Sequence, residues 1–188
     1  KRVLIFDLDP QGNASTGLGI ARDARDIDSY AVLIGESAIV DAAIPTLVPH
    51  LDVVPSSVHL SGAEIELVDM AAREYRLREA IGKLAAHKCP YDYVIVDCPP
   101  SLGLLTLNAL VAADSILVPL QCEFYALEGL SQLLQTVEAV RQRFNAALDI
   151  QGVVLTMFDR RNNLSLAVAN DVRAHMGEKV YKTMIPHN

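Results

Sequence analysis

The sequence predicts an α/β fold: a doubly wound, mostly parallel sheet with helices on both faces. Short, continuous apolar runs such as Val3–Phe6 are typical of strands that are buried on both faces. Segments with apolar residues at helical spacing separate these runs, so strand and helix alternate along the chain. Such alternation favours a parallel sheet, and a hydrophobic content of 51% is sufficient for its core.

The predicted strands are short apolar segments. They comprise residues 3–6, 51–55, 93–96, 115–118, 150–158 and 179–185. We expect Pro99 and Pro100 to stop the third strand and Pro119 to close the fourth, because proline lacks the amide that a sheet ladder needs.

The predicted helices lie between these strands. Apolar residues near helical spacing predict helices over residues 62–87, 101–112, 125–144 and 164–175. Ser101 is the expected N-cap of the second helix, because a serine oxygen accepts from the unpaired amides of a first turn. Residues 21–49 form the least regular segment, for which we expect short helices only.

Length and composition predict a single domain over residues 1–188, since no internal repeat or long linker divides the chain. No apolar run approaches the roughly 18–20 residues that cross a bilayer, so no membrane association is expected. No signal peptide is expected either, because the chain opens with Lys1 and Arg2 and runs directly into a strand. The three cysteines share no C-x-x-C spacing, which favours reduced core thiols in a cytoplasmic protein.

Charge is unevenly distributed along the chain. The net charge is −7, and residues 1–140 hold 9 Lys/Arg against 19 Asp/Glu, whereas residues 141–188 hold 7 against 4. The overall balance argues against a chain that coats nucleic acid over its whole surface. The positive C-terminal segment fits either a polyanion-binding face or an ordinary solvated helix surface.

Carboxylates follow two of the predicted strands. Asp7 and Asp9 come after the first strand and Asp97 after the third, and ligands of open parallel sheets bind beyond the carboxyl ends of the strands. Mg²⁺ needs only one or two protein carboxylates beside phosphates, and a further carboxylate can orient an attacking water. Each aspartate taken singly also fits an N-cap or turn residue. A dinucleotide site and a hydrolase elbow are disfavoured, because the sequence has no G-x-G-x-x-G or G-x-S-x-G motif.

Four segments, taken together, resemble the ParA/Soj family of partition ATPases, in the deviant Walker A P-loop group. Residues 7–19 resemble the segment after its phosphate loop, and residues 91–102 resemble its Walker B strand and switch. Residues 121–130 and 155–159 match further blocks in order. The resemblance covers essentially the whole chain and implies a P-loop NTPase-like fold, here as a partial nucleotide-binding domain.

The resemblance implies a role for particular residues. Asp9 would position the water that attacks the γ-phosphate, Asp7 would support the magnesium and phosphate region, and Asp97 would hold Mg²⁺ through water. The implied γ-phosphate switch consists of Pro99, Pro100 and Ser101. The implied nucleotide-binding residues are Pro10, Gln11, Met157, Phe158, Asp159, Pro186 and Asn188.

The resemblance also implies partners. Such a protein binds ATP or ADP with Mg²⁺, forms a homodimer with ATP, binds DNA without sequence preference near the nucleoid, and responds to a ParB-like protein. Candidate DNA contacts are Arg160, Arg161, Arg173, Lys179 and Lys182. The family's Lys-Gly-Gly-Val-Gly-Lys-Thr-type loop would lie upstream of Lys1 and its terminal helices after Asn188. Residues 1–188 contain neither, so we expect them to be inactive by themselves.

One alternative keeps the fold and changes the function. The same domain could serve as a non-hydrolytic scaffold or regulatory module, as in a MinD-like relative. The missing loop favours this alternative for residues 1–188, whereas Asp7, Asp9 and Asp97 favour a hydrolytic protein.

Overall fold

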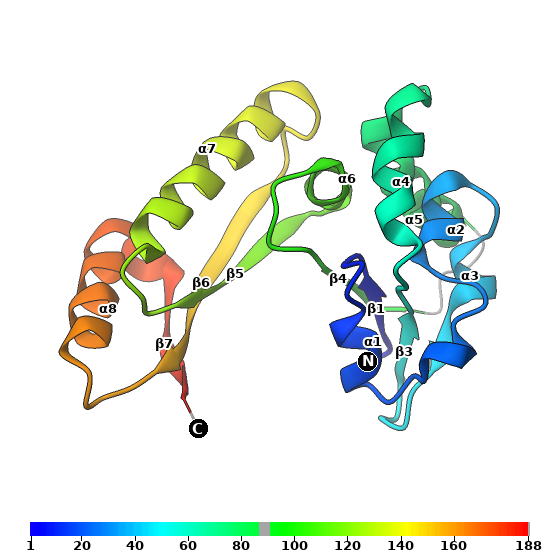
Figure 1. Ribbon diagram of the computed structural model, residues 1–188. Helices are drawn as coiled ribbons and strands as arrows, with labels where there is room; N and C mark the ends of the chain where they lie inside the picture. Colours follow the sequence, from blue (N-terminus) through cyan, green and yellow to red (C-terminus); the bar gives the residue numbers. More distant parts are fainter. Residues whose placement is uncertain (87–90, 188) are drawn as a thin grey trace. The chain divides into compact units, whose positions relative to one another are not determined.

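The computed structural model describes residues 1–86 and 91–187, and the chain divides into two compact units, Lys1–Ala112 and Ala113–Asn188 (Figure 1). Both units are built from parallel strands and helices, so the predicted α/β class is confirmed. The expectation of one domain over the whole chain stays a prediction. In the described part of the chain, no helix has the length and apolar character to span a bilayer.

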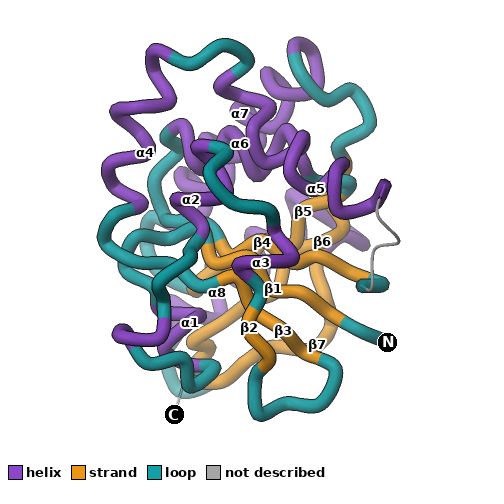
Figure 2. The backbone as a smooth tube through the Cα atoms, turned by 90° about the vertical axis from the view of Figure 1, so that its right-hand side faces the viewer, coloured by secondary structure: helices purple, strands orange, loops and turns teal. Residues whose placement is uncertain are grey.

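The first unit contains a four-stranded sheet in the order β2-β3-β1-β4 (Figures 1 and 2). Its central strand β1 (Val3–Asp7) pairs in parallel with β3 (Leu51–Val54) and with β4 (Tyr93–Asp97). The short β2 (Ile44–Pro45) is antiparallel to β3. The apolar runs around β1, β3 and β4 therefore form the predicted strands.

Helices of the first unit bury part of the apolar surface of this sheet, whereas Tyr93 and Ile95 of β4 are 58% and 54% exposed. They are α1 (Asn13–Gly17), α2 (Ser29–Ile34), α3 (Ile39–Ala42), α4 (Leu60–Glu66), α5 (Arg76–Ala86) and α6 (Leu104–Ala112), with 3-10 turns η1 (Arg22–Ala24), η2 (Leu67–Asp69) and η3 (Arg73–Tyr75). Leu4 and Phe6 of β1 pack in the core with Leu33, Leu77 and Leu105, all of them fully or almost fully buried. The segment 21–49 carries short helices, as expected, together with the two-residue strand β2.

The single helix predicted over residues 62–87 is wrong. The chain forms α4, two 3-10 turns and α5 instead, because Met70 is extended and Ala72 adopts a left-handed conformation with φ 52°. Leu67 and Leu77 lie on either side of this break and are both fully buried. The apolar pattern therefore continues through the break and hides it from a periodicity argument. The predicted end, His87, lies outside the described residues.

The predicted N-cap of α6 is also wrong in detail. The helix begins at Leu104, and Ser101 contributes its carbonyl oxygen, which accepts a hydrogen bond from Thr106 Oγ1 at 2.6 Å. Two prolines and Gly103 keep residues 99–103 out of the helix. Residues 99–101 thus form a loop after β4.

The second unit contains a three-stranded parallel sheet in the order β5-β6-β7. Its elements are β5 (Ser115–Gln121), α7 (Ala126–Arg143), β6 (Asp149–Phe158), α8 (Asn163–Met176), the 3-10 turn η4 (Gly177–Lys179) and β7 (Val180–Pro186). Helices α7 and α8 contact one another, and each contacts a strand of this sheet. The predicted helices 125–144 and 164–175 are confirmed to within a residue or two.

Pro119 does not close its strand, contrary to the prediction. It lies within β5, opposite Val154, and the strand continues to Gln121. Within this sheet β5 is an edge strand, and an edge strand tolerates the missing proline amide because that amide can point away from the ladder.

Candidate functional site

Two parallel strands of the first unit bring their terminal aspartates to one edge of the sheet. Asp7 ends β1 and lies opposite Asp97, which ends β4. The amide of Leu8 donates to the carbonyl oxygen of Asp97 at 2.8 Å, so the ladder continues one residue past the strands. The carboxylate clusters that follow β1 and β4 therefore lie at the same end of the sheet.

Asp7 is a buried carboxylate whose two oxygens both accept hydrogen bonds. Its Oδ2 accepts from the Ser15 amide at 2.8 Å and from Ser15 Oγ at 2.6 Å. Its Oδ1 accepts from the Asp9 amide at 3.2 Å. These hydrogen bonds fix the start of α1 against the end of β1.

Two serines that sequence reasoning missed complete this arrangement. Ser15 Oγ accepts a hydrogen bond from the Ser56 amide at 3.0 Å, and both residues are fully buried. Ser56 follows β3, so the loop after that strand is tied through Ser15 to Asp7. The contact joins residues 41 positions apart, and no local sequence signal could have found it.

Asp9 begins a tight turn that leads into α1. Its Oδ1 accepts from the Gln11 amide at 2.9 Å, and its carbonyl oxygen accepts from the Gly12 amide at 2.9 Å. Gly12 precedes the helix with φ 63°, a conformation that favours glycine. Asp9 and Pro10 are half-buried and Gln11 is exposed, so the predicted Asp9–Gln11 segment lies at the accessible edge of the sheet.

The electrostatics of this edge favour a bound cation. Partial desolvation raises the pKa of Asp97, and the negative charges of Asp7 and Asp9 raise it further. Within residues 1–86 and 91–187, none of these three carboxylates forms an ion pair with a basic side chain. The same part of the chain holds no cluster of three or more ligands arranged for a metal ion. A water-rich Mg²⁺ site, which needs only one or two carboxylates, fits these residues.

The loop after β4 lies beside the same carboxylates. Pro99 is half-buried, whereas Pro100 and Ser101 are exposed.

Burial raises the pKa of the Cys98 thiol to about 12, and the neighbouring Asp97 charge adds to this effect. Cys98 is therefore a protonated thiol rather than a nucleophile. Cys122 is a buried free thiol, and Cys89 lies outside the described residues.

The predicted adenine-pocket residues lie in the second unit. Phe158 pairs with Pro186 across β6 and β7, and the His187 amide donates to the Phe158 carbonyl oxygen at 3.2 Å. Met157 is 44% exposed and has φ 52°, a strained conformation for a residue with a side chain. Asp159 is half-buried beside them. The structure thus brings four of these residues together at one sheet edge, while Asn188 lies outside the described residues.

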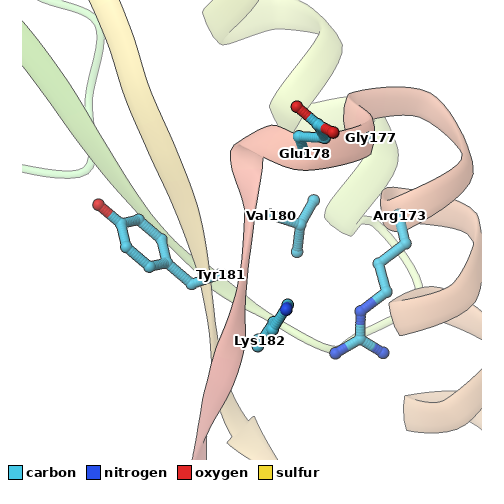
Figure 3. Close-up of a pocket in the computed structure, with 6 residues that line it drawn as sticks. All are labelled: Arg173, Gly177, Glu178, Val180, Tyr181 and Lys182. Atoms are coloured by element: carbon cyan, nitrogen blue, oxygen red, sulfur yellow. The ribbon is translucent and has the colours of Figure 1, made fainter.

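The five candidate DNA contacts differ in their surroundings. Arg161 pairs with Asp159, which lowers the pKa of that carboxyl, and Lys179 pairs with Asp149 at 3.0 Å. Arg173 and Lys182 line one open hollow of about 820 Å³ together with Gly177, Glu178, Val180 and Tyr181 (Figure 3). Arg160 is exposed. The structure therefore brings Arg173 and Lys182 together.

The parallel α/β fold, with acids at the carboxyl ends of β1 and β4, defines the class of the protein as a P-loop NTPase-like domain. The family model described as "AAA domain" (AAA_31) matches residues 1–150. The chromosome partitioning protein ParA of Caulobacter vibrioides (strain NA1000 / CB15N) is 60% identical over 188 residues, which are 100% of this chain and 70% of that relative. The sporulation initiation inhibitor protein Soj of Bacillus subtilis (strain 168) is 53% identical, over 100% of this chain and 73% of that relative. The chain belongs to the ParA/Soj family of partition proteins.

Solved structures agree with the fold class. Cobyrinic acid a,c-diamide synthase from Mycobacterium smegmatis, with bound ADP and magnesium, is 40% identical, with a TM-score of 0.89 over 100% of this chain and 75% of that chain. A plasmid partition protein from Borrelia burgdorferi has a TM-score of 0.82 over 100% of this chain and 77% of that chain, at 23% identity, and shows the fold alone.

Proposed function

We propose that the protein is a magnesium-dependent partition ATPase whose nucleotide state switches its interactions with DNA and protein partners. The observation that carries this proposal is the group of three carboxylates, without a basic partner in the described residues, at the edge where β1 and β4 end. Membership of the ParA/Soj family supports ATP as the nucleotide. The higher identity to chromosome partitioning proteins favours partition over diamide synthesis.

In this proposal the three carboxylates have separate tasks. Asp97 holds Mg²⁺ through water, and Asp9 orients the water that attacks the γ-phosphate. Asp7 is buried and fully hydrogen-bonded, so it acts by fixing the turn that carries Asp9. When bound, Mg²⁺ neutralises charge on the phosphates.

Further candidate nucleotide contacts lie in each unit. Pro10 and Gln11 extend the Asp9 turn, and the loop Pro99–Ser101 senses the γ-phosphate. In the second unit, the proposed adenine contacts are Met157, Phe158, Asp159 and Pro186, and Asn188, which lies outside the described residues, is a further candidate. The backbone strain at Met157 supports a functional role there, because strained backbone conformations cluster at ligand sites.

The proposed switch dimerises with ATP, binds DNA without sequence preference and is stimulated by a ParB-like partner, in the cytoplasm at the nucleoid. Arg160, Arg173 and Lys182 are the favoured DNA contacts. Arg161 and Lys179 are less favoured, because each forms an ion pair within the second unit.

The deciding experiment measures Mg²⁺-dependent ATP binding and hydrolysis. Residues 1–188 are compared with a longer chain that carries a Lys-Gly-Gly-Val-Gly-Lys-Thr-type loop ahead of residue 1. We expect binding and turnover from the longer chain, and none from residues 1–188. A folded longer chain that binds ATP without turnover would favour the non-hydrolytic, MinD-like scaffold. Failure of the longer chain to bind ATP would overturn the proposal.

DNA binding is tested by its salt dependence in the ATP state. Replacing Lys182 with alanine should weaken binding to all sequences alike and reduce the salt slope by about 1, as expected for the loss of one phosphate contact. Arg78→Ala is the matched control, because Arg78 is an exposed cation on α5 in the first unit. Equal effects of the two substitutions would remove Lys182 from the DNA interface.

A further inference from the structure

Arg25 is a buried arginine for which the proposed mechanism gives no role. It directly follows the 3-10 turn η1 and is 7% exposed. Its guanidinium donates to carbonyl oxygens and to one hydroxyl: from Nη1 to Ser56 at 2.8 Å and to Gly12 at 3.5 Å, and from Nη2 to Ile20 at 2.8 Å and to Thr16 Oγ1 at 2.9 Å. These acceptors come from both ends of α1 and from the loop after β3.

No carboxylate neutralises this charge in the described part of the chain. None of the ion pairs formed there includes Arg25, and its buried Nε has no hydrogen-bond partner there. Burial of a charged group is unfavourable unless it is paired or hydrogen-bonded. A guanidinium bound to neutral acceptors is costly for the fold alone, so its position between those segments calls for a further explanation.

Arg25 contacts the turn that carries Asp9. A Cβ atom added at Gly12 would clash with Arg25 Nη1 and would lie 2.8 Å from the Ser56 carbonyl oxygen, so the guanidinium packs directly against the Gly12 backbone. Thr16 Oγ1 accepts from Arg25 and donates to the Gly12 carbonyl oxygen at 2.9 Å. The Gly12 amide in turn donates to the carbonyl oxygen of Asp9.

A second set of contacts leads from Arg25 to Asp7. Arg25 Nη1 binds the Ser56 carbonyl oxygen, while the Ser56 amide donates to Ser15 Oγ. Ser15 then donates to Asp7 through both its hydroxyl and its amide. The guanidinium therefore lies at the junction of two hydrogen-bonded chains, one ending at Asp9 and the other at Asp7.

We propose that Arg25 is a positioning residue for ATP hydrolysis, which holds the Asp9 turn so that the Asp9 carboxylate is oriented for the attacking water. The proposal rests on the proposed function. Arg25 acts through its contacts with Gly12, Thr16 and Ser56. Rigid support of this kind affects turnover, because small errors in the placement of a catalytic group reduce rate strongly.

The test uses the full-length protein and the substitutions Arg25→Lys and Thr16→Val. Lysine keeps the charge but offers a single nitrogen in place of the planar fork, and valine removes the hydroxyl between Arg25 and Gly12. We expect kcat for ATP to fall about tenfold or more for Arg25→Lys and severalfold for Thr16→Val, as for other losses of geometric alignment, with ATP affinity within about twofold of the wild type. Arg22→Met is the matched control, because Arg22 is an exposed arginine on η1.

A second measurement does not depend on turnover. Hydrogen exchange of the Gly12 and Ser15 amides, which bind Asp9 and Asp7, should accelerate in Arg25→Lys and stay unchanged in Arg22→Met. Unchanged exchange in a folded Arg25→Lys protein would overturn the proposal, even if the wild type fails to hydrolyse ATP. A parallel loss of kcat and ATP affinity, or failure of both variants to fold, would assign Arg25 a structural role only. If the wild type does not hydrolyse ATP but exchange is still accelerated in Arg25→Lys, the proposed function is rejected and the positioning role of Arg25 is not.

Discussion

The two ends of the sheet in the first unit use the same residue type in opposite ways. At the amino end, Asp92 accepts from the Arg2 amide at 2.7 Å and pairs with Lys1 at 3.3 Å, and the Arg2 amide and then Lys1 lower its pKa. At the carboxyl end, only five positions later, Asp97 has no basic partner in the described residues, and its pKa is raised. Strand β4 thus lies between an aspartate that has a basic partner and one that has none in the described residues.

In the proposed function, this difference distinguishes structural acids from functional ones. The amino end is held by side chains: Asp52 accepts from Tyr91 at 2.8 Å and pairs with Arg2 at 3.2 Å. The carboxyl end is held by backbone amides and serines around Asp7, and the remaining negative charge is left for a ligand. A charged group kept at a cost to stability is a marker of function.

The sharpest test of this comparison replaces each aspartate of the pair. In the full-length protein, Asp97→Asn should reduce Mg²⁺-dependent ATP hydrolysis by about 100-fold or more, because loss of one pre-organised electrostatic contact has effects of that size. Asp92→Asn, at the other end of β4, should leave turnover within about twofold. Steady-state phosphate release at saturating ATP and Mg²⁺ measures both. Equal rates for the two variants would contradict the assignment of the carboxyl end as the site.

The second prediction concerns the backbone that builds the carboxyl end. Gly12 has φ 63° and a Cβ there would meet Arg25 and Ser56, so Gly12→Ala should destabilise the protein by about 2–4 kcal/mol. Gly19 has φ 82°, and apart from Gly19 and its chain neighbours no described atom lies within 4 Å of the position that a Cβ would occupy there, so Gly19→Ala should cost only the conformational part, about 1–2 kcal/mol. Urea unfolding of both variants gives the contact energy by difference. Equal decreases in the free energy of unfolding would show that the contact with Arg25 does not add to the cost of the Gly12 substitution.

The third prediction breaks one side-chain contact at the amino end. Tyr91→Phe removes the hydroxyl that donates to Asp52 and keeps the ring that stacks near Arg2. The expected loss of stability is about 0.5–1.5 kcal/mol, the usual value of one hydrogen bond, with unchanged ATP turnover. A loss of turnover without a loss of stability would show that the amino end also serves the site.

The smallest expected effect concerns how Asp97 and Asp92 change stability with pH in the absence of Mg²⁺. The two aspartates should have contributions of opposite sign. A carboxyl with a raised folded-state pKa opposes folding once it ionises, so Asp97 weakens the fold as pH rises through that pKa. A carboxyl with a lowered pKa stabilises the fold above its unfolded value, and Asp92 loses this effect as pH falls through its folded-state pKa. At neutral pH, Asp97→Asn should therefore raise the urea midpoint and Asp92→Asn should lower it. Shifts of the same sign would refute the comparison.

Local patterns predicted most of the architecture. The apolar runs located the strands, and the acids at their ends located the candidate site, because parallel strands deliver their carboxyl ends to one edge. Pro119 was misread because whether a strand lies at an edge is a property of the sheet and not of the strand itself. The break between α4 and α5 was missed because Ala72 carries no sign of its left-handed conformation.

The supporting contacts of the site could not be predicted. Arg25 binds Ser56 across 31 residues, and Ser56 binds Ser15 across 41. Such contacts depend on how three loops fold back over one sheet edge. A buried arginine in the irregular segment 21–49 has the same sequence signature as an exposed one such as Arg22.

The hydrogen bond from the Leu8 amide to the Asp97 carbonyl oxygen has a practical consequence. Leu8 is fully buried and lies between Asp7 and Asp9, so the amide signal of Leu8 in ¹⁵N-labelled protein can report on the site without an attached probe or a substitution. A shift of this one resonance on nucleotide addition would follow the distance between the ends of β1 and β4. Following this resonance during a nucleotide titration would therefore measure the fraction of protein with bound ligand.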